Sequence, residues 1–213
     1  MSSPTKLLLI GAGGHAKVLL SLLQATGRMV DGVCDPKLRD EGVAVWRGIP
    51  VLGGDEVLES LDPAEVSLVN GIGQVPRGLG RRSVQDRLAS LGFGFPVLVH
   101  PAAWVDSTAK LAHGAQVMAG AVIQADAAIG ENTIINTRAV VEHDCSIGPD
   151  VHVAPGGTIC GGVQVGAGTF IGSGATVIQG LRIGEGCTVG AGTTVIRDIR
   201  DGSIYLGPGR RLR

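Results

Sequence analysis

The chain has 213 residues, which is enough for one large domain or two small ones. Its formal net charge of −1 provides no basic surface for nucleic acid, and none of its apolar runs is long enough to span a membrane. Glycine is abundant, at 35 residues, and aromatic residues make up only 3%, so the core must be built from Val, Ile, Leu and Ala.

Residues 1–97 alternate predicted strands and helices. The expected strands are Lys6–Gly11, Met29–Asp35 and Glu65–Gly73, and the expected helices are His15–Gly27, Gly54–Asp62 and Gly80–Gly92. Asp55 is a candidate N-cap for the second helix. The first strand is continuously apolar, as in a buried parallel sheet. The alternation predicts a small Rossmann-like α/β domain, in which a parallel sheet is flanked by helices.

A glycine-rich turn follows the first strand. Gly11, Gly13 and Ala16 have the G-x-G-x-x-[GA] spacing that lets a phosphate approach the backbone at a helix N-terminus, and Asp35 ends the second strand. Alone, this pattern favours NAD and a dehydrogenase, but the region is short for a complete dinucleotide-binding domain. His15 stands at the helix start, where an imidazole either meets a ligand or merely caps the helix.

Residues 98–213 follow a hexapeptide repeat. Every sixth residue from Val99 to Val195 is aliphatic, and a second column of mostly small residues follows four places after each of them. This period predicts a parallel β-helix, in which three hexapeptides form one triangular coil and neighbouring coils stabilise each other. The aliphatic column is expected to point inward. Small residues and glycines, including Gly130, Gly148 and Gly166, are expected to form the corners.

The cysteines and the N-terminus indicate a cytoplasmic protein. The four cysteines contain no CxxC pair and no zinc-type spacing, so reduced thiols and no metal site are expected. The short apolar run near the N-terminus has no cleavage-site pattern and is interpreted as a strand rather than a signal peptide.

Four motifs match, in order, one family over nearly the whole chain. They are GAGGHAKV, CDPK, GIPVLGG and EHDCSIG. The chain thereby resembles the bacterial sugar acyltransferases of the sialic-acid O-acetyltransferase type, whose nucleotide-sugar N-acetyltransferase branch uses acetyl-CoA to acetylate the 4-amino group of a UDP- or GDP-linked amino-deoxysugar. The resemblance implies a left-handed β-helix, whereas the general crossover rule favours the right hand. It also implies a homotrimer with active sites between subunits and a role in surface-glycan synthesis.

The same resemblance assigns the N-terminal domain to the nucleotide sugar rather than to NAD. The residues implied to line this pocket are Gly11, Gly13, Gly14, His15, Asp35, Lys37, Gly71, Ile72 and Gly73. The last three end the third predicted strand, where open α/β sheets usually bind ligands.

The polar triplet Glu142-His143-Asp144 is the candidate catalytic cluster. Acetyl transfer to an amine needs a base, an oxyanion donor and alignment of the two substrates, and a histidine near neutral pKa is a suitable base. The resemblance favours His143 as the base and Asp144 as its orienting partner, with Glu142 a bystander. Adjacent strand residues point to opposite faces, so a contact between His143 and Asp144 requires a corner or bulge, or an Asp from another subunit.

Acetyl-CoA is expected along the β-helix. The resemblance places His152 near the acetyl carbonyl, with the Gly161 amide as a second donor. Residues eighteen apart stack on successive coils about 4.8 Å apart, so CoA is expected to cross several coils along columns that include Ser173 and Ala191. Basic side chains near the C-terminus either meet the CoA phosphates or lie in solvent; they are Arg182, Arg197, Arg210, Arg211 and Arg213.

Several alternatives remain open from sequence. The motifs do not separate N-acetylation from O-acetylation of a sugar, and they name neither UDP nor GDP. A covalent acyl-enzyme at Cys160 has no support, and a solenoid without chemistry is the structural alternative. A β-helical carbonic anhydrase is disfavoured because the histidines lack a close metal-binding pair.

Overall fold

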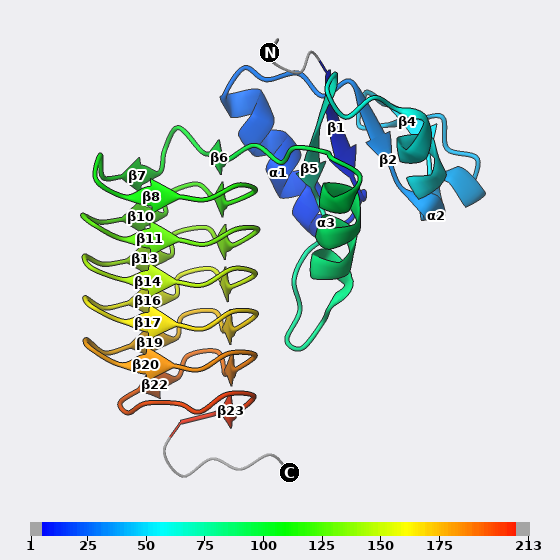
Figure 1. Cartoon of the computed structure of the whole chain (residues 1–213). Helices are drawn as coiled ribbons and strands as arrows, with labels where there is room; N and C mark the ends of the chain where they lie inside the picture. The colour runs from blue at the N-terminus through cyan, green and yellow to red at the C-terminus, as the bar shows by residue number, and fades with distance from the viewer. Residues whose placement is uncertain (1–5, 208–213) are drawn as a thin grey trace. The chain divides into compact units, whose positions relative to one another are not determined.

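The structure is a computed structural model that describes residues 6–207 (Figure 1). The chain forms two compact units. The first, here the N-terminal unit, comprises residues 6–74 and 79–96, and the second, here the solenoid, comprises residues 75–78 and 97–207. Arg210, Arg211 and Arg213, named above as candidate CoA contacts, lie outside the described residues.

The N-terminal unit is built on a five-stranded sheet of order β3-β4-β2-β1-β5. Its strands are β1 (Lys6–Ile10), β2 (Gly32–Cys34), β3 (Val45–Trp46), β4 (Ile49–Gly53) and β5 (Val66–Asn70). The pairs β1–β2, β1–β5 and β2–β4 are parallel, whereas β3 and β4 are antiparallel. The sheet is therefore mixed, because a hairpin that the sequence analysis did not predict adds β3 and β4 at one side.

Helices cover both faces of this sheet. They are α1 (Gly14–Ala25), α2 (Pro36–Asp40), the 3₁₀ helix η1 (Asp55–Ser60) and α3 (Gly80–Ser90). One face of β1 packs Leu8 and Ile10 against Leu58 of η1 and Leu88 of α3. The other face of β1 carries Leu9, and α1 buries its apolar residues on that side. The three predicted strands are present as β1, β2 and β5, and the two long predicted helices are present as α1 and α3.

Two details of this unit differ from expectation. The segment expected as an α-helix at residues 54–62 is a short 3₁₀ helix with Gly54 at its N-cap, so the assignment of Asp55 as the cap is wrong. Asp55 instead forms an ion pair with Arg87 of α3. The helix α2 was not expected. Asp35 caps it and Pro36 occupies its first turn, where the fixed φ of proline is favourable.

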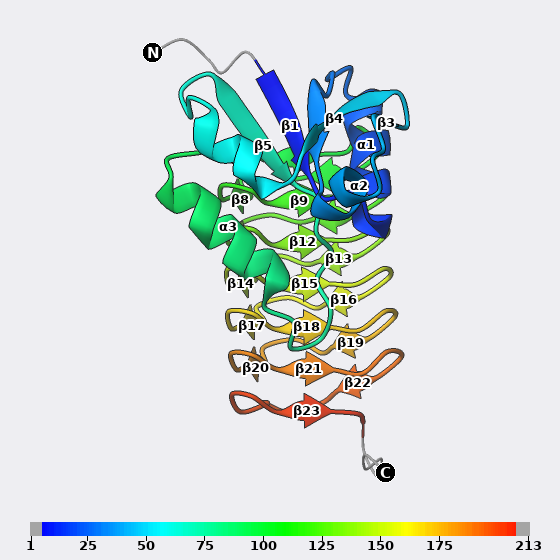
Figure 2. The ribbon, with the colours of Figure 1, turned by 90° about the vertical axis from the view of Figure 1, so that its right-hand side faces the viewer.

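The solenoid is a left-handed parallel β-helix, as expected. Its strands are two residues long and form three sheets, each named here by one member (Figures 1 and 2). The β13 sheet contains β7 (Trp104–Val105), β10 (Val122–Ile123), β13 (Val140–Val141), β16 (Thr158–Ile159), β19 (Thr176–Val177) and β22 (Thr194–Val195). The β14 sheet contains β8 (Lys110–Leu111), β11 (Ala128–Ile129), β14 (Ser146–Ile147), β17 (Gln164–Val165) and β20 (Arg182–Ile183). The β15 sheet contains β6 (Leu98–Val99), β9 (Gln116–Val117), β12 (Ile134–Ile135), β15 (His152–Val153), β18 (Phe170–Ile171), β21 (Thr188–Val189) and β23 (Ile204–Tyr205).

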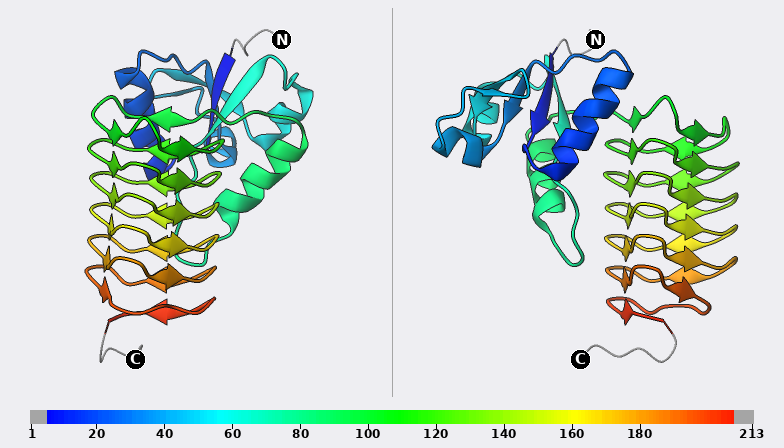
Figure 3. Two further views of the ribbon diagram at one scale, coloured as in Figure 1. Left: turned by 60° about the vertical axis from the view of Figure 1, so that its left-hand side comes forward. Right: turned by 180° about the vertical axis from the view of Figure 1, so that it is seen from behind.

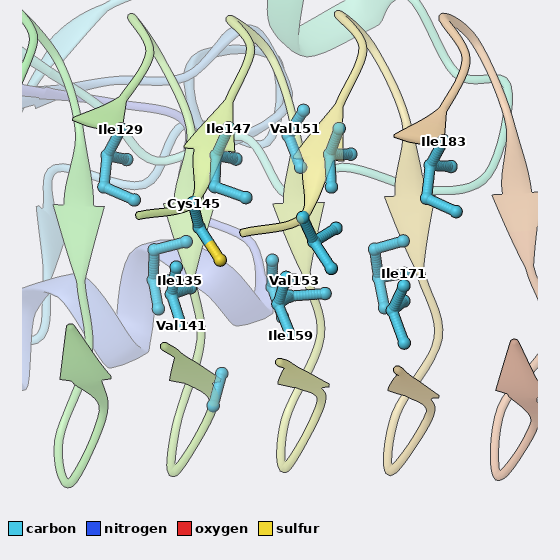
Figure 4. Packing of buried hydrophobic residues seen from close by; sticks show 14 of the residues in the cluster. Ile129, Ile135, Val141, Cys145, Ile147, Val151, Val153, Ile159, Ile171 and Ile183 are labelled. Carbon is cyan, nitrogen blue, oxygen red and sulfur yellow. The ribbon is translucent and has the colours of Figure 1, made fainter. Parts of the chain in front are cut away.

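The aliphatic column fills the interior of the solenoid, as predicted. Successive coils are in register at eighteen residues, so Val141 pairs with Ile159 and Ile147 with Val165. The coils repeat along one axis in every view (Figure 3). Figure 4 shows the inward side chains in rows, with Ile129, Ile147 and Ile183 in one of them. Because each row continues through several coils, burial in one coil stabilises its neighbours.

The corners are formed by a different column from the one expected. Positive φ occurs at the third residue after each aliphatic residue, at every sixth position from Gly114 to Gly192. Pro149 and Pro155 directly precede two of these residues, as in type II turns, which favour proline before a residue of positive φ. Five consecutive corners carry a side chain at this position; they are Asp126, Asn132, Arg138, Asp144 and Asp150.

The glycines directly after the aliphatic column have another role. Gly130, Gly148 and Gly166 do not appear among the residues of positive φ. A Cβ at Gly130 would lie 2.5 Å from the backbone of Gly148, and one at Gly166 would lie 2.6 Å from the backbone of Glu185. These glycines are needed because successive coils approach closely there, so the expectation that they form the turns is wrong.

The last coil is shorter than the others. Ile183 bridges to Ile199 and Val189 pairs with Tyr205, a separation of sixteen residues instead of eighteen. The carboxylates of Asp198 and Asp201 accept hydrogen bonds from the amides of Arg182 and Glu185, both at 2.9 Å. Side-chain oxygens therefore replace backbone carbonyls at this end of the solenoid.

None of the helices among residues 6–207 is long and apolar enough to cross a membrane.

Candidate active site

His143 and Asp144 lie at a corner of the solenoid. The corner joins β13 to β14, and the stack of equivalent corners between these two sheets is here called the His143 edge. Asp144 has a φ of 60°, so the chain turns sharply at this residue. The turn brings both side chains to one side, and His143 Nδ1 lies 2.8 Å from Asp144 Oδ2. The corner that a contact between these neighbours required is therefore present within one chain.

Both side chains are accessible from solvent. The side chain of His143 is 63% exposed and that of Asp144 is 65% exposed. The hydrogen bond to Asp144 raises the pKa of His143 above its usual value, and the nearby charges of Asp144 and Glu142 add smaller contributions in the same direction. Partial desolvation of the imidazole opposes them. With Nδ1 donating to the carboxylate, the neutral imidazole keeps its lone pair on Nε2.

Gly161 lies next to the imidazole on the following coil. The amide of Gly162 donates to the carbonyl of His143 at 2.9 Å, and the amide of Gly180 donates to the carbonyl of Gly161 at the same distance. Positions 143, 161 and 179 thus stack on successive coils, as expected of residues eighteen apart. A Cβ on Gly161 would lie 2.6 Å from His143 Nε2, so this glycine leaves the space that the imidazole occupies.

Cys145, beside this corner, is inert by environment. Cys145 is buried, its thiol donates to the carbonyl of Cys160 at 3.1 Å, and desolvation raises the pKa of Cys145. Burial likewise raises the pKa of Cys34, in the N-terminal unit, to about 11. Cys34, Cys145, Cys160 and Cys187 are all free thiols. A protonated, buried thiol is a poor nucleophile, so Cys145 packs the core rather than entering the chemistry.

The other candidate CoA contacts lie elsewhere on the solenoid. Ser173 and Ala191 stack on Pro155 at the corners that join the β15 sheet to the β13 sheet, here called the Ser173 edge. His152 lies on β15, is only 7% exposed, and contacts Asn136 through Nε2 at 2.9 Å. Its ring also meets Phe170 edge-on, with ring centroids 5.1 Å apart. A single chain therefore does not bring these residues to the His143 edge.

The predicted nucleotide pocket lies at the carboxyl end of β1 and β5. Gly11 has a φ of 83°, and its amide donates to the carbonyl of Cys34 at the end of β2. Gly13 is the N-cap of α1 without a side-chain hydrogen bond, and a Cβ on Gly13 or Gly14 would meet nothing within 4 Å. The start of α1 thus presents bare backbone with space beside it, as an anionic ligand requires.

His15 joins this turn to the end of β5. A Cβ on Gly73 would lie 3.4 Å from the Cβ of His15, so the two residues are neighbours. A Cβ on Gly71 would lie 2.7 Å from the carbonyl oxygen of Ile10, which excludes any side chain there. The structure therefore brings Gly11, Gly13, Gly14, His15 and the stretch 71–73 to one edge of the sheet.

The Asp35 carboxylate contacts the same turn through hydrogen bonds to the backbone. Its Oδ2 accepts from the amide of Ala12 at 2.8 Å, and its Oδ1 accepts from the amide of Leu38 at 3.0 Å. The carboxylate therefore fixes the glycine-rich turn to the start of α2. Lys37, on α2, has an 82% exposed side chain and pairs with Glu41 at 3.8 Å. No described contact joins Lys37 to the other candidate residues.

Sequence analysis missed one residue that shapes this edge. Arg81 of α3 is 2% exposed and donates to the carbonyls of Asn70 and Ile72, at 2.9 and 2.8 Å. The side chain of Asn70 donates to Gln85 and accepts from the amide of Ile72, both at 3.1 Å. These contacts fix the backbone on both sides of Gly71. An arginine on a helix that looks basic and solvent-facing gives no sequence signal for this role.

Within residues 6–207, no group of three or more His, Cys, Asp or Glu side chains is arranged to hold a metal ion.

Comparisons with known proteins identify both units. Residues 6–88 match the PglD N-terminal domain, and residues 126–161 and 162–197 match the bacterial transferase hexapeptide repeat. No curated protein sequence matches the chain.

Solved structures match over nearly the whole chain. The acetyltransferase domain of PglB from Neisseria gonorrhoeae, in complex with acetyl coenzyme A, is 36% identical, with 95% of this chain and 96% of that chain covered and a TM-score of 0.87. PerB from Caulobacter crescentus, in complex with CoA and GDP-perosamine, is 38% identical, with 93% and 92% covered and a TM-score of 0.85. WeeI from Acinetobacter baumannii, at 20% identity and a TM-score of 0.77, shares the fold.

Identity above one third over almost the full length, together with both family matches, establishes the family. The chain belongs to the bacterial sugar acyltransferases that join a PglD-type N-terminal domain to a left-handed β-helix of hexapeptide repeats.

Proposed function

We propose that this protein is an acetyl-CoA-dependent N-acetyltransferase that acetylates the amino group, at C4, of a nucleotide-linked amino-deoxysugar. The observation that carries the proposal is the His143–Asp144 pair, in which Nδ1 is held at 2.8 Å from a carboxylate on an accessible corner. Similarity over nearly the whole chain to the acetyltransferase domain of PglB, in complex with acetyl coenzyme A, and to PerB, in complex with CoA and GDP-perosamine, supports the two substrates.

His143 acts as the general base. Its Nε2 takes a proton from the sugar amine as the amine nitrogen attacks the thioester carbonyl, and a C–N bond forms. The tetrahedral intermediate then collapses, the C–S bond breaks, and the proton on Nε2 passes to the departing CoA thiolate. Asp144 keeps the imidazole in the required tautomer and stabilises its positive charge between the two proton transfers. A single imidazole therefore completes the cycle without a covalent enzyme intermediate.

The N-terminal unit binds the nucleotide sugar. The bare backbone at Gly13 and Gly14 and the start of α1 suit the diphosphate, because helix N-termini favour negative charge. His15 and the residues from Gly71 to Gly73 adjoin this turn and contact the sugar nucleotide in our proposal. Asp35 contributes by holding the turn in place through Ala12 rather than by presenting an unoccupied carboxylate.

The working enzyme is proposed to be a homotrimer in which the β13 sheet faces the threefold axis. The outward side chains of this sheet include Val122 and Val140, which are half-buried, and Trp104, which is 61% exposed. The outward side chains of the β14 sheet are more polar, among them Lys110 and Gln164. The remaining outward residues of the β13 sheet are Thr158, Thr176 and Thr194, so this surface is uncharged and mostly β-branched, which suits a permanent interface.

This arrangement accounts for the scattered CoA contacts. The β13 sheet lies between the His143 edge and the Ser173 edge of the same chain. When three such sheets surround one axis, the His143 edge of each subunit lies beside the Ser173 edge of the next. His143 and Gly161 of one chain would then share a groove with Ser173 and Ala191 of its neighbour, and with His152 near that edge.

A cytoplasmic location fits this assignment. The four cysteines are free thiols, as in a reducing compartment, and both proposed substrates are cytoplasmic metabolites.

The function is tested by measuring CoA release from acetyl-CoA with a panel of UDP- and GDP-linked sugars. The panel pairs each 4-amino sugar with its 4-hydroxy counterpart. Turnover of the amine alone, with an amide in the product, is the expected result. Turnover of the hydroxyl compounds alone would instead identify a sugar O-acetyltransferase, and no turnover of either would refute acetyl transfer to nucleotide sugars.

The assembly is tested separately by light scattering during size-exclusion chromatography. Wild-type protein is expected at three times the chain mass. Val140→Arg introduces a charge into the proposed interface and is expected to yield monomers with little activity. Gln164→Arg, on the β14 sheet, is the matched control and is expected to stay trimeric. A wild-type monomer with full activity would contradict the shared groove.

A further inference from the structure

The corners of the solenoid contain one glycine that the turn itself does not require. At every sixth position from Gly114 to Gly192 a residue of positive φ forms the corner. The residue before it carries a side chain at every corner from His113 to Ala191 except at Gly161. Gly161 is not among the residues of positive φ, so its backbone conformation accepts any L-residue. Type II turns even favour proline at this position, as at Pro149 and Pro155.

The exception coincides with the imidazole of His143. A Cβ on Gly161 would lie 2.6 Å from Nε2, 2.7 Å from Cε1 and 3.3 Å from Cδ2 of His143. These ring atoms are the three nearest heavy atoms, so the imidazole is the first group that a side chain at position 161 would meet. Contacts under 3.0 Å are not tolerated by carbon atoms, and the ring would have to move.

We propose that Gly161 is a positioning residue whose missing side chain gives the His143 imidazole its place. The inference rests on the proposed role of His143 as the base. With the space open, Nδ1 of the ring reaches Asp144 at 2.8 Å, which leaves Nε2 for the substrate. With the space filled, the ring rotates about its side-chain bonds into solvent, because it is 63% exposed and meets little resistance.

A second reason for a glycine here is approach of the thioester to the bare backbone at the Gly161 amide, which the resemblance implies to be a hydrogen-bond donor. The two roles differ in what a methyl group would disturb. If Gly161 positions the ring, a methyl group alters His143 even without substrates. If Gly161 makes room for acetyl-CoA, a methyl group weakens acetyl-CoA binding and leaves the titration of His143 unchanged.

The test is Gly161→Ala, with Gly94→Ala as the matched control. A Cβ on Gly94 would meet nothing within 4 Å, and its φ is not positive. Titration of the imidazole by NMR, without substrate, is expected to show a lower pKa for His143 in Gly161→Ala, because the hydrogen bond from Nδ1 to Asp144 raises this pKa in the wild type. Gly94→Ala is expected to titrate like the wild type.

Kinetics provide the second measurement. Misplacement of a catalytic group by about 1 Å costs on the order of 100-fold in rate, so kcat of Gly161→Ala is expected to fall by about that factor. The KM for acetyl-CoA is expected to stay within about twofold, since binding is not the step affected.

A double variant separates the two roles further. In His143→Ala the ring is absent and the methyl group meets no obstacle. Adding Gly161→Ala to His143→Ala is therefore expected to leave its melting temperature unchanged. An unshifted His143 titration, a raised KM for acetyl-CoA in Gly161→Ala, or a lower melting temperature of the double variant than of His143→Ala would each overturn the proposal. The NMR result needs no turnover, so it stands or fails independently of the proposed function.

Discussion

The two units of this protein hold their candidate sites in different ways. In the solenoid the site is made by side chains, His143 and Asp144, placed on a corner whose backbone repeats through many coils. In the N-terminal unit it is made largely by bare backbone, at Gly13 and Gly14, and the side chains around it hold that backbone in place.

This difference determines how each site can be recognised from sequence and which substitutions disrupt it. A repeat defines what every position should contain, so a departure such as the polar corner at His143 is informative by itself. In the N-terminal sheet a polar residue has no such reference, and Asp35 illustrates the result. Sequence marks it as a candidate ligand contact, and in the structure its carboxylate ties a turn to a helix, a role that no sequence pattern indicates.

The largest expected effect comes from His143→Ala. Loss of a general base reduces turnover by about 10²–10⁴-fold, and kcat is expected to fall within this range. The KM for the nucleotide sugar should stay nearly constant, because the N-terminal unit is untouched. Steady-state kinetics and circular dichroism of the folded variant check both points. Near-normal kcat would break the assignment of the chemistry to the solenoid corner.

Asp144→Asn is expected to have the next largest effect. The amide oxygen still accepts from Nδ1, but the negative charge that raises the pKa of His143 is gone, so this pKa falls. The base must be neutral to act, and the acidic limb of the profile of kcat/KM against pH therefore moves to lower pH. Above that limb the rate is expected to drop by about 10–100-fold, as for other carboxylates that orient a functional histidine.

Glu142→Gln serves as the control for this measurement, since Glu142 makes the smallest contribution to the same shift. Its profile should move in the same direction by less than that of Asp144→Asn. An equal or larger movement would indicate that long-range charge, rather than the hydrogen bond, sets the pKa of His143.

Asp35→Ala should affect the other unit. It removes the cap of α2 and the acceptor for Ala12, which costs about 1–2 kcal/mol of stability by loss of the cap alone. The melting temperature is expected to fall by several degrees and the KM for the nucleotide sugar to rise about tenfold, while the KM for acetyl-CoA stays constant. An unchanged sugar KM in a folded variant would separate this turn from nucleotide binding.

Lys37→Ala is expected to have the smallest effect. Its side chain is 82% exposed and its pair with Glu41 at 3.8 Å is a surface ion pair, which is worth at most about 1 kcal/mol. Less than a twofold change in either KM is expected. A tenfold rise in sugar KM would show that Lys37 contacts the nucleotide sugar directly. The site of the N-terminal unit would then also depend on a side chain.

Most of the solenoid could be predicted from sequence, because the hexapeptide period specifies which residues point inward. Val141 and Ile147 are inward for the same reason as every other member of their column. A further signal was available but not used. The residue three places after each aliphatic one is Gly, Asn or Asp at nearly every coil, and these are the residues that tolerate positive φ. That column would have placed Asp144 at a corner without a structure.

The N-terminal unit was less predictable. Its two-residue strand β3 and its five-residue helix α2 are too short for a periodic pattern. Whether such short elements form depends on specific contacts, such as the N-cap hydrogen bond that Asp35 accepts at the start of α2. The fixing of the β5 end by Arg81 depends on a buried guanidinium, which no local pattern announces. For the candidate site, sequence named the residues of the His143 corner but not the space that Gly161 leaves for the ring.

The shortened last coil has a consequence for solubility. Stacked parallel strands end in a row of unpaired amides and carbonyls, and such an edge invites another chain to continue the sheet. Here the final turn is two residues short, and Asp198 and Asp201 occupy the amides of Arg182 and Glu185. At the edge of the β14 sheet, where β20 is the last strand, a second solenoid would therefore meet carboxylates in place of free amides. The shortened last coil thereby works against end-to-end growth of this sheet.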